Sequence, residues 1–265
     1  MTPETTPAGF YDDPAADYHL IFADWDAAIA WEAGIITGLM RDRGVTAGAV
    51  LDASCGIGTQ AIGLAHAGFA VTATDISPAS VERCAREAEA RGLAIATAVA
   101  DMRVLDGVTA AGGFAAAVSF DNALAHLLDA ADLDAACVAL RRVLRPGGAL
   151  LASNRDYDEA LRARPAGDPP RRYATKLGER ITFQLWEWDA ARADDRYTLR
   201  HFIMARGGRG WTVAERMTTL RALTRAAVSD ALGRAGFADV AWLMPGETGF
   251  YQPIVAASAG SGGGR

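Results

Sequence analysis

The stretch LDASCGIGTQA (residues 51–61) is the local pattern most informative about the fold. It joins a short apolar run, 49–52, to a stretch of helical periodicity, 58–66. Gly56 and Gly58 permit a tight turn and let the backbone approach a ligand where that helix begins. Taken alone, these glycines also match the G-x-G-x-x-G/A dinucleotide fingerprint and suit a plain strand-to-helix turn. The stretch therefore predicts a strand–turn–helix unit and leaves its ligand open.

Short apolar runs alternate with amphipathic stretches on both sides of this unit, which favours a mostly parallel α/β sheet. The expected helices are 25–41, 58–66, 77–91, 132–144 and 224–234. The expected strands are 49–52, 69–74, 93–100, 114–120, 149–153, 238–243 and 253–257. RPGG at 145–148 predicts a turn before the fifth strand.

The alternating pattern stops after residue 153. Residues 159–178 are rich in Pro, Arg and Gly, which predicts a loop. Three β-like runs follow, at 180–188, 197–205 and 211–223, with turn signals between them. We therefore expect an antiparallel insertion over 155–223 on the substrate side of the sheet, an N-terminal lid arm and helix over 1–44, and a disordered tail over 259–265.

Composition narrows the class of protein. Of 265 residues, 51% are hydrophobic and 22% are charged, which excludes wholesale disorder. The chain has no apolar run long enough to span a bilayer, and its first basic residue is Arg41, so we expect a cytoplasmic protein without membrane association. The 3 cysteines are far apart and the 4 histidines are scattered, which indicates neither disulfides nor a metal site.

Charge also bears on the ligand. The net charge is −6, yet residues 155–225 hold 15 bases against 10 acids, a local excess of +5. Nucleic-acid binders usually show a stronger basic stripe with interleaved aromatic residues. The excess therefore favours an anionic small molecule over nucleic acid.

Acidic residues end three of the expected strands. Asp75 follows Gly58 by 17 residues, where an acid accepts both hydroxyls of a ribose. Asp101, followed by Met102, suits the amino group and the face of an adenine. Asp52, beside the glycine turn, would repel a pyrophosphate but suits the ammonium of a methionine moiety. This set favours S-adenosylmethionine over a nicotinamide cofactor.

With these motifs the chain resembles the class I S-adenosylmethionine-dependent methyltransferases over about 45–155 and 224–258. The resemblance implies a Rossmann-like domain over 45–154 and 224–258, with a mostly parallel sheet whose last strand is antiparallel. It also implies S-adenosyl-L-methionine as cofactor, S-adenosyl-L-homocysteine as product, and no metal. The implied cofactor-binding residues are Tyr18, Phe22, Asp52, Ala53, Gly56, Gly58, Asp75, Ile76, Asp101, Met102 and Phe120.

A narrower resemblance, to the glycine/sarcosine N-methyltransferase group, rests on three further segments. They are FYDDPAADYHLIFADW (10–25), SFDNALAHL (119–127), which is similar to the family pattern LGNSFAHL, and NRDYD (154–158), which is similar to HRNYD. The resemblance implies a lid over 8–25, and the catalytic residues that it implies are Tyr11, Asn122 and His126. The implied substrate-binding residues are Arg155, which would grip a carboxylate, Tyr173 and His201.

The chain also departs from that group. The family's lid arginine has no counterpart in ADWDAAIAW, Asp156 replaces an asparagine, and His201 or Phe202 stands where a pocket tyrosine is expected. Structural roles stay open as well. The N-terminal aromatic residues could hold the N-terminal arm to the body of the protein, and Asn122 and His126 could cap and support the helix after the fourth strand. Arg155 could pair with acidic residues at 156, 158 or 159 in a surface network.

The expected function is methyl transfer to a small-molecule acceptor, with the amine nitrogen of a carboxylate-bearing molecule as the leading case. C- or O-methylation of a specialised metabolite is an alternative on the same fold, and an acidic acceptor would then need His126 or His201 as base. A nicotinamide-dependent oxidoreductase and a non-catalytic S-adenosylmethionine-binding module are the alternatives from other classes. Homo-oligomer formation is left open.

Overall fold

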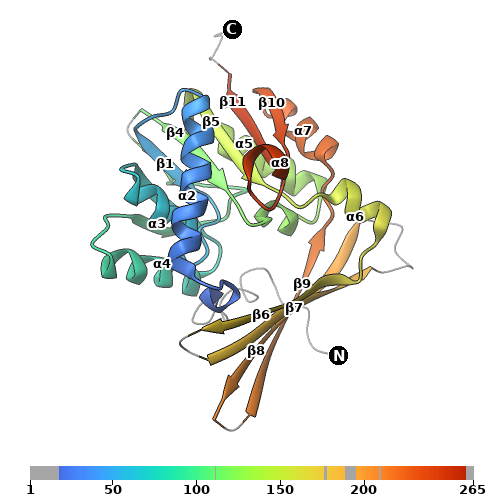
Figure 1. The fold of residues 1–265 in the computed structure, drawn as a ribbon. Coiled ribbons are helices and arrows are strands. Elements are labelled where there is room, and N and C mark those ends of the chain that lie inside the picture. The colour runs from blue at the N-terminus through green and yellow to red at the C-terminus, as the bar shows by residue number, and fades with distance from the viewer. Residues whose placement is uncertain (1–17, 111, 176–177, 189–194, 209, 261–265) are drawn as a thin grey trace.

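The computed structural model describes residues 18–110, 112–175, 178–188, 195–208 and 210–260, and it contains two sheets (Figure 1). The larger sheet has seven strands in the order β10-β11-β5-β4-β1-β2-β3, and the smaller has four in the order β6-β7-β8-β9. Figure 1 shows the smaller sheet extending away from the larger one, with β9 leading back to α7.

The larger sheet combines both strand directions. Its strands are β1 (Ala49–Asp52), β2 (Ala70–Asp75), β3 (Ala96–Val99), β4 (Phe114–Ser119), β5 (Leu144–Ser153), β10 (Phe237–Leu243) and β11 (Ile254–Ala259). Strands β1 to β5 pair in parallel, whereas β11 lies between β5 and β10 and is antiparallel to both. This arrangement confirms the predicted Rossmann-like sheet with an antiparallel last strand.

Helices cover both faces of this sheet. The helices of the described residues are η1 (Tyr18–Ile21), α2 (Trp25–Asp42), α3 (Thr59–His66), α4 (Pro78–Ala90), η2 (Ala123–His126), α5 (Ala130–Val143), α6 (Tyr157–Ala163), α7 (Arg225–Arg234) and α8 (Pro245–Thr248). Successive side chains of a strand point to opposite faces, so Leu51 packs in one core cluster with α5 and α7, and Val50 packs in another with α2 and α3. Burial on both faces explains the continuous apolar runs of the central strands.

The smaller sheet is antiparallel throughout. Its strands are β6 (Gly167–Thr175), β7 (Gly178–Trp188), β8 (Arg196–Gly207) and β9 (Gly210–Arg221). Buried Trp186, Tyr197 and Leu199 join the core cluster of α5 and α7, which connects the two sheets. The three predicted strands of the insertion are therefore present, together with a fourth.

The prediction of a loop over 159–178 is wrong, because this segment contains the end of α6 and all of β6. Strand β6 lies at the edge of its sheet, and its register with β7 shifts between Asp168 and Arg171, around Pro169 and Pro170. Proline is tolerated in strands only at such edges and bulges. A proline-rich composition therefore hid an edge strand.

Two smaller expectations are also corrected. Strand β5 begins at Leu144, and the RPGG residues form an excursion within it, since Phe114 pairs with Leu144 and Ala116 pairs with Ala149. Strand β11 extends to Ala259, which was expected to begin the tail. Among the described residues, no helix has both the length and the apolar character needed to cross a membrane.

Candidate active site

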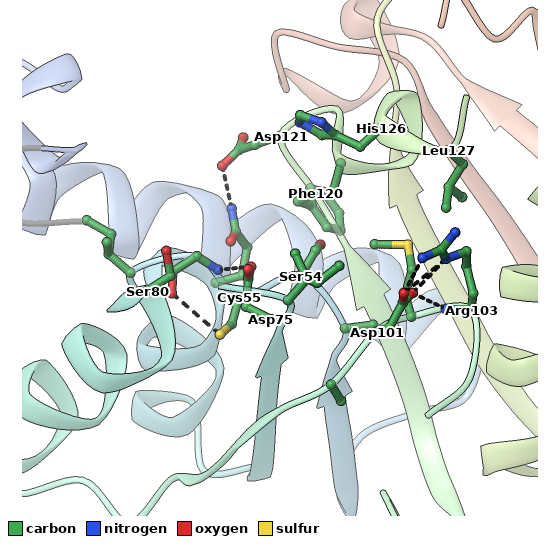
Figure 2. Close-up of a pocket in the computed structure, with 18 of the residues that line it drawn as sticks. Ser54, Cys55, Asp75, Ser80, Asp101, Arg103, Phe120, Asp121, His126 and Leu127 are labelled. Atoms are coloured by element: carbon green, nitrogen blue, oxygen red, sulfur yellow. Dashed lines mark hydrogen bonds and ion pairs between the residues drawn. The ribbon is translucent and has the colours of Figure 1, made fainter. Parts of the chain in front are cut away.

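A first cavity of about 440 Å³ opens beside the glycine turn, where β1, β2 and β4 end. Figure 2 shows Asp101 and Arg103 together in one part of it, and Asp121 and His126 in another. The predicted site residues that line this cavity are Tyr18, Ala53, Gly56, Asp75, Ile76, Asp101, Met102, Phe120 and His126. Residues far apart in the sequence are therefore brought to one edge of the sheet, as predicted for parallel strands.

The glycine turn holds the carboxylate of Asp75. Gly56 has φ +50°, a left-handed conformation that glycine adopts without strain. Its backbone N–H donates to Asp75 Oδ2 at 2.9 Å, and the N–H of Ser77 donates to Oδ1 at 2.9 Å. Both oxygens are thus oriented at the cavity wall, and each carboxylate oxygen has lone pairs for more than one hydrogen bond.

Arg103 holds the carboxylate of Asp101 in place. Its Nε lies 3.0 Å from both carboxylate oxygens of Asp101, and its Nη1 lies 2.9 Å from Oδ1 of Asp132. Hydrogen bonds from Arg103 keep the pKa of Asp101 below its ordinary value. Sequence reasoning missed Arg103, although its place directly after Asp101 and Met102 was a usable signal.

Three residues predicted to bind the cofactor do not line the first cavity: Phe22, Asp52 and Gly58. The Asp52 carboxyl is fully buried, and its Oδ1 accepts from the N–H of Ser54 at 3.3 Å. Gly58 has φ +102°, and a Cβ there would lie 2.8 Å from Cys84 Sγ, so it allows α3 to pack closely against α4. Phe22 lines a different cavity.

This second cavity, of about 600 Å³, lies between the two sheets. Its lining contains the predicted residues Tyr18, Phe22, Asn122, His126, Arg155, Tyr173 and His201. Tyr18, Asp121 and His126 line both cavities, so the two adjoin along a common wall. All three predicted substrate-binding residues therefore lie together, next to the predicted cofactor residues.

Arg155 is oriented from several sides. Its Nη2 donates to Gln184 Oε1 at 2.7 Å, and its guanidinium carbon lies 4.4 Å from the ring centroid of Trp186. Nη1 is buried and has no hydrogen-bond partner among the described residues. Arg155 Nη2 also forms an ion pair with Asp168 Oδ2 at 3.9 Å, so Nη1 is the nitrogen that suits a carboxylate or another planar anion in the cavity.

Asn122 holds Arg155 in place. Its Oδ1 accepts from the backbone N–H of Arg155 at 3.1 Å, and its Nδ2 donates to the hydroxyl of Tyr157 at 2.8 Å. The Tyr157 hydroxyl lies 2.9 Å from that of Tyr197 in the smaller sheet. Tyr157 and Tyr197 were not singled out from the sequence, since buried tyrosines have no local signature.

Burial makes the two histidines poor proton acceptors. It lowers the pKa of His126 to about 4, and burial together with the charges of Arg216 and Arg155 lowers the pKa of His201 to about 4. Both imidazoles are therefore neutral near pH 7. His126 lies on the common wall, and His201 lies in β8, opposite Gln184 of β7.

A buried polar cluster on the common wall was also missed. Gln60 Nε2 donates to Glu32 Oε2 at 2.6 Å and to Asp121 Oδ2 at 2.9 Å, and the hydroxyl of Tyr251 donates to Asp121 Oδ1. Glu32 was detectable, because it shares the apolar face of its helix with Ile29 and Ile36 at spacings of three and four.

Residues 50–148 match the family model of a methyltransferase domain. The chain is 33% identical over 138 residues to the glycine/sarcosine N-methyltransferase of Parasynechococcus marenigrum, covering 52% of this chain and 48% of that protein. It is 37% identical over 122 residues to the ubiquinone biosynthesis O-methyltransferase of Methylocella silvestris, covering 44% and 45%. The chain thus spans about half the length of these relatives.

A solved S-adenosylmethionine-dependent methyltransferase from Clostridium acetobutylicum superposes with a TM-score of 0.73 at 17% identity, covering 94% of this chain and 99% of that one. Residues 50–148 thus form a methyltransferase domain, within a chain that has the fold of the class I S-adenosylmethionine-dependent methyltransferases. The family resemblance drawn from the sequence is confirmed.

The residues that line the first cavity fit S-adenosylmethionine on chemical grounds. The oriented carboxylate of Asp75 suits a ribose diol, and Asp101 with Met102 offers an acceptor and an apolar surface to an adenine. Tyr11 and most of the expected lid lie outside the described residues, whereas Tyr18 and Phe22 are described and line cavities.

Proposed function

We propose that this methyltransferase binds S-adenosylmethionine in the first cavity and methylates the amine nitrogen of a small molecule held in the second. The observation that carries the proposal is the common wall of Tyr18, Asp121 and His126 between the two cavities. Such a wall lets a methyl donor and an acceptor meet without leaving their own binding sites.

The assignment of the first cavity rests on Asp75, Asp101 and Met102. Asp75 would accept the two ribose hydroxyls, since its carboxylate is already oriented by Gly56 and Ser77. Asp101 would accept from the adenine amino group, while Met102 would pack on the ring. No metal is needed for this binding.

The bound cofactor supplies a methyl group on a positively charged sulfur. The nitrogen lone pair of the acceptor forms a bond to that methyl carbon as the carbon–sulfur bond breaks, and the electron pair of the broken bond stays on sulfur. Positive charge moves from sulfur to nitrogen, so alignment and exclusion of water are the main tasks of the chain. Tyr18 and Phe120 line the first cavity at or next to the common wall and would exclude water from the place where the methyl group is transferred.

The assignment of the acceptor rests on Arg155. Its unpartnered, buried Nη1 would pair with a carboxylate or a similar anion on the acceptor. The similarity to a glycine/sarcosine N-methyltransferase supports an acceptor with an amine beside a carboxylate. O-methylation is the second candidate, supported by the O-methyltransferase relative.

A two-stage experiment tests the function. Calorimetric titration should first detect binding of S-adenosylhomocysteine, and amino acids, amino sugars and their hydroxy analogues are then screened for its release from S-adenosylmethionine. Release with amines that carry an anionic group, and not with their hydroxy analogues, is the expected result. Release only with hydroxy acceptors would establish O-methylation instead, and binding without release from any acceptor would indicate a binding module.

A further inference from the structure

Two carboxylates from distant parts of the sequence meet at the common wall. Glu32 lies on α2 and lines the second cavity, and Asp121 follows β4 and lines both cavities. We call these two residues the acidic pair. Gln60, at the beginning of α3, donates to one oxygen of each, which holds the two carboxylates near one another.

One carboxylate oxygen of the acidic pair is available to a ligand. Glu32 is fully buried, and its Oε1 has no hydrogen-bond partner among the described residues, although its Oε2 is bound to Gln60. A buried, unpartnered carboxylate oxygen is costly unless a donor comes to it. At a cavity wall, that donor is expected to be a ligand.

Aromatic rings surround the same place. Tyr18, Trp31 and Tyr251 line the second cavity together with the acidic pair, and the rings of Trp31 and Tyr251 are stacked at 6.1 Å between centroids. Carboxylates combined with aromatic faces favour a cation, because both attract positive charge. An ammonium group, with several N–H donors, satisfies both kinds of surface.

We propose that the acidic pair binds the amine of the acceptor and takes up its proton, so that the nitrogen lone pair faces the cofactor cavity. This assignment rests on the proposed function and adds the group that recognises the amine. Arg155 lies on the wall of the same cavity, so the acceptor would place its amine at the acidic pair and its anionic group at the arginine.

The proton step is simple. An N–H bond of the acceptor's ammonium breaks, its electron pair stays on nitrogen, and the proton forms an O–H bond with Glu32 before it is released to water. Burial and the charge of Asp121 raise the pKa of Glu32, so its carboxylate, once ionised beside the bound ammonium, is a stronger base than an exposed glutamate. Gln60 and Asp52 also face Glu32, while Gln60 and Tyr251 face Asp121.

Sinefungin provides a probe that does not require the natural acceptor. It is an S-adenosylmethionine analogue in which a carbon bearing a primary amine replaces the methylated sulfur, so its amine would reach the common wall. S-adenosylhomocysteine lacks this amine and has no charge at that position. The ratio of the two dissociation constants therefore measures how well the wall holds an amine.

The variants are Glu32→Gln and Asp121→Asn, which replace each carboxyl group by an amide of nearly the same shape that can neither ionise nor accept the proton. Asp121→Gly removes the side chain and suits its φ of +57°, a conformation that glycine adopts readily. Glu82→Gln is the control, because the Glu82 side chain, on α4, is 70% exposed. Binding of S-adenosylhomocysteine by each variant reports that its cofactor cavity is intact.

The preference for sinefungin over S-adenosylhomocysteine should fall about tenfold in each acidic-pair variant and stay constant in the control. The preference for S-adenosylmethionine over S-adenosylhomocysteine should change by less than about threefold. An unchanged sinefungin preference in the acidic-pair variants would overturn the inference. An equal fall in the preference for S-adenosylmethionine would also overturn it, because the pair would then bind the positively charged sulfur of the cofactor. If the parent protein binds none of these molecules, the proposed function itself fails and the inference fails with it.

Discussion

The side chain of Asn122 fixes the backbone of Arg155: its Oδ1 accepts the Arg155 N–H at 3.1 Å. The two residues follow neighbouring parallel strands, β4 and β5. Their contact connects the loop beside the cofactor cavity to the arginine of the second cavity. Asn122 is thus a positioning residue for Arg155, and its Nδ2 continues the connection to Tyr157.

This network predicts a loss of stability in Tyr157→Phe. The substitution leaves buried Asn122 Nδ2 without its acceptor, which should lower the free energy of unfolding by about 1–3 kcal/mol. Urea unfolding followed by circular dichroism measures this. Tyr173→Phe, at a half-exposed ring, is the matched control and should stay within about 0.5 kcal/mol of the parent. Equal stability of the two variants would contradict the network's role.

Asp75→Ala should weaken cofactor binding. The loss of an ionised acceptor for the ribose hydroxyls is expected to cost about 1.5–3 kcal/mol of binding free energy. Calorimetric titration with S-adenosylmethionine measures it, with Asp106→Ala as control, because the Asp106 side chain is 76% exposed and lies outside the first cavity. Unchanged affinity in Asp75→Ala would remove the ribose assignment.

Arg155→Ala should impair the acceptor and spare the cofactor. For an amine that carries a carboxylate, we expect a loss of about 1.5–3 kcal/mol in acceptor binding, seen as a raised KM. Arg155→Lys should restore only part of it, because an ammonium cannot replace the planar fork. Steady-state kinetics and calorimetry with S-adenosylhomocysteine separate the two effects. Normal kinetics in Arg155→Ala would make the arginine structural.

Asp52 predicts how stability depends on pH. Burial raises its pKa to about 8, against about 3.9 in the unfolded chain, so the folded state binds more protons between these values. Its contribution to stability is therefore complete below about pH 4 and falls as pH rises towards 8, by at most about 1.4 kcal/mol per pH unit. Denaturant titrations from pH 5 to 8 should show a flatter profile in Asp52→Asn. Parallel profiles for variant and parent would show that Asp52 is ionised in the folded protein.

The cofactor side of the site was predictable because its residues sit in local motifs. Asp75 and Asp101 each end a strand, and parallel strands bring their ends to one edge. Asp52 shows the limit of this reasoning, since packing determines the direction in which a side chain at a strand end points. Gly58 serves the contact of α3 with Cys84, which no local pattern indicates.

The acceptor side depends on contacts between distant segments. Arg155 could be carried over from the resemblance, but the acidic pair brings together α2 and the loop after β4, and Tyr251 comes from the far end of the chain. Asp121 stands where the family pattern LGNSFAHL has glycine, which was visible in the sequence. Its place in the acidic pair becomes evident only from the structure, in which Gln60 donates hydrogen bonds to both Asp121 and Glu32.

The most direct test follows the methyl group itself. The protein is supplied with S-adenosylmethionine carrying a ¹³C-labelled methyl group and with the best amine from the acceptor screen, and the product is examined by carbon NMR. The account predicts that the label appears as a methyl group bonded to nitrogen. Label on oxygen or carbon, or label that stays on the cofactor with every acceptor tested, would contradict it.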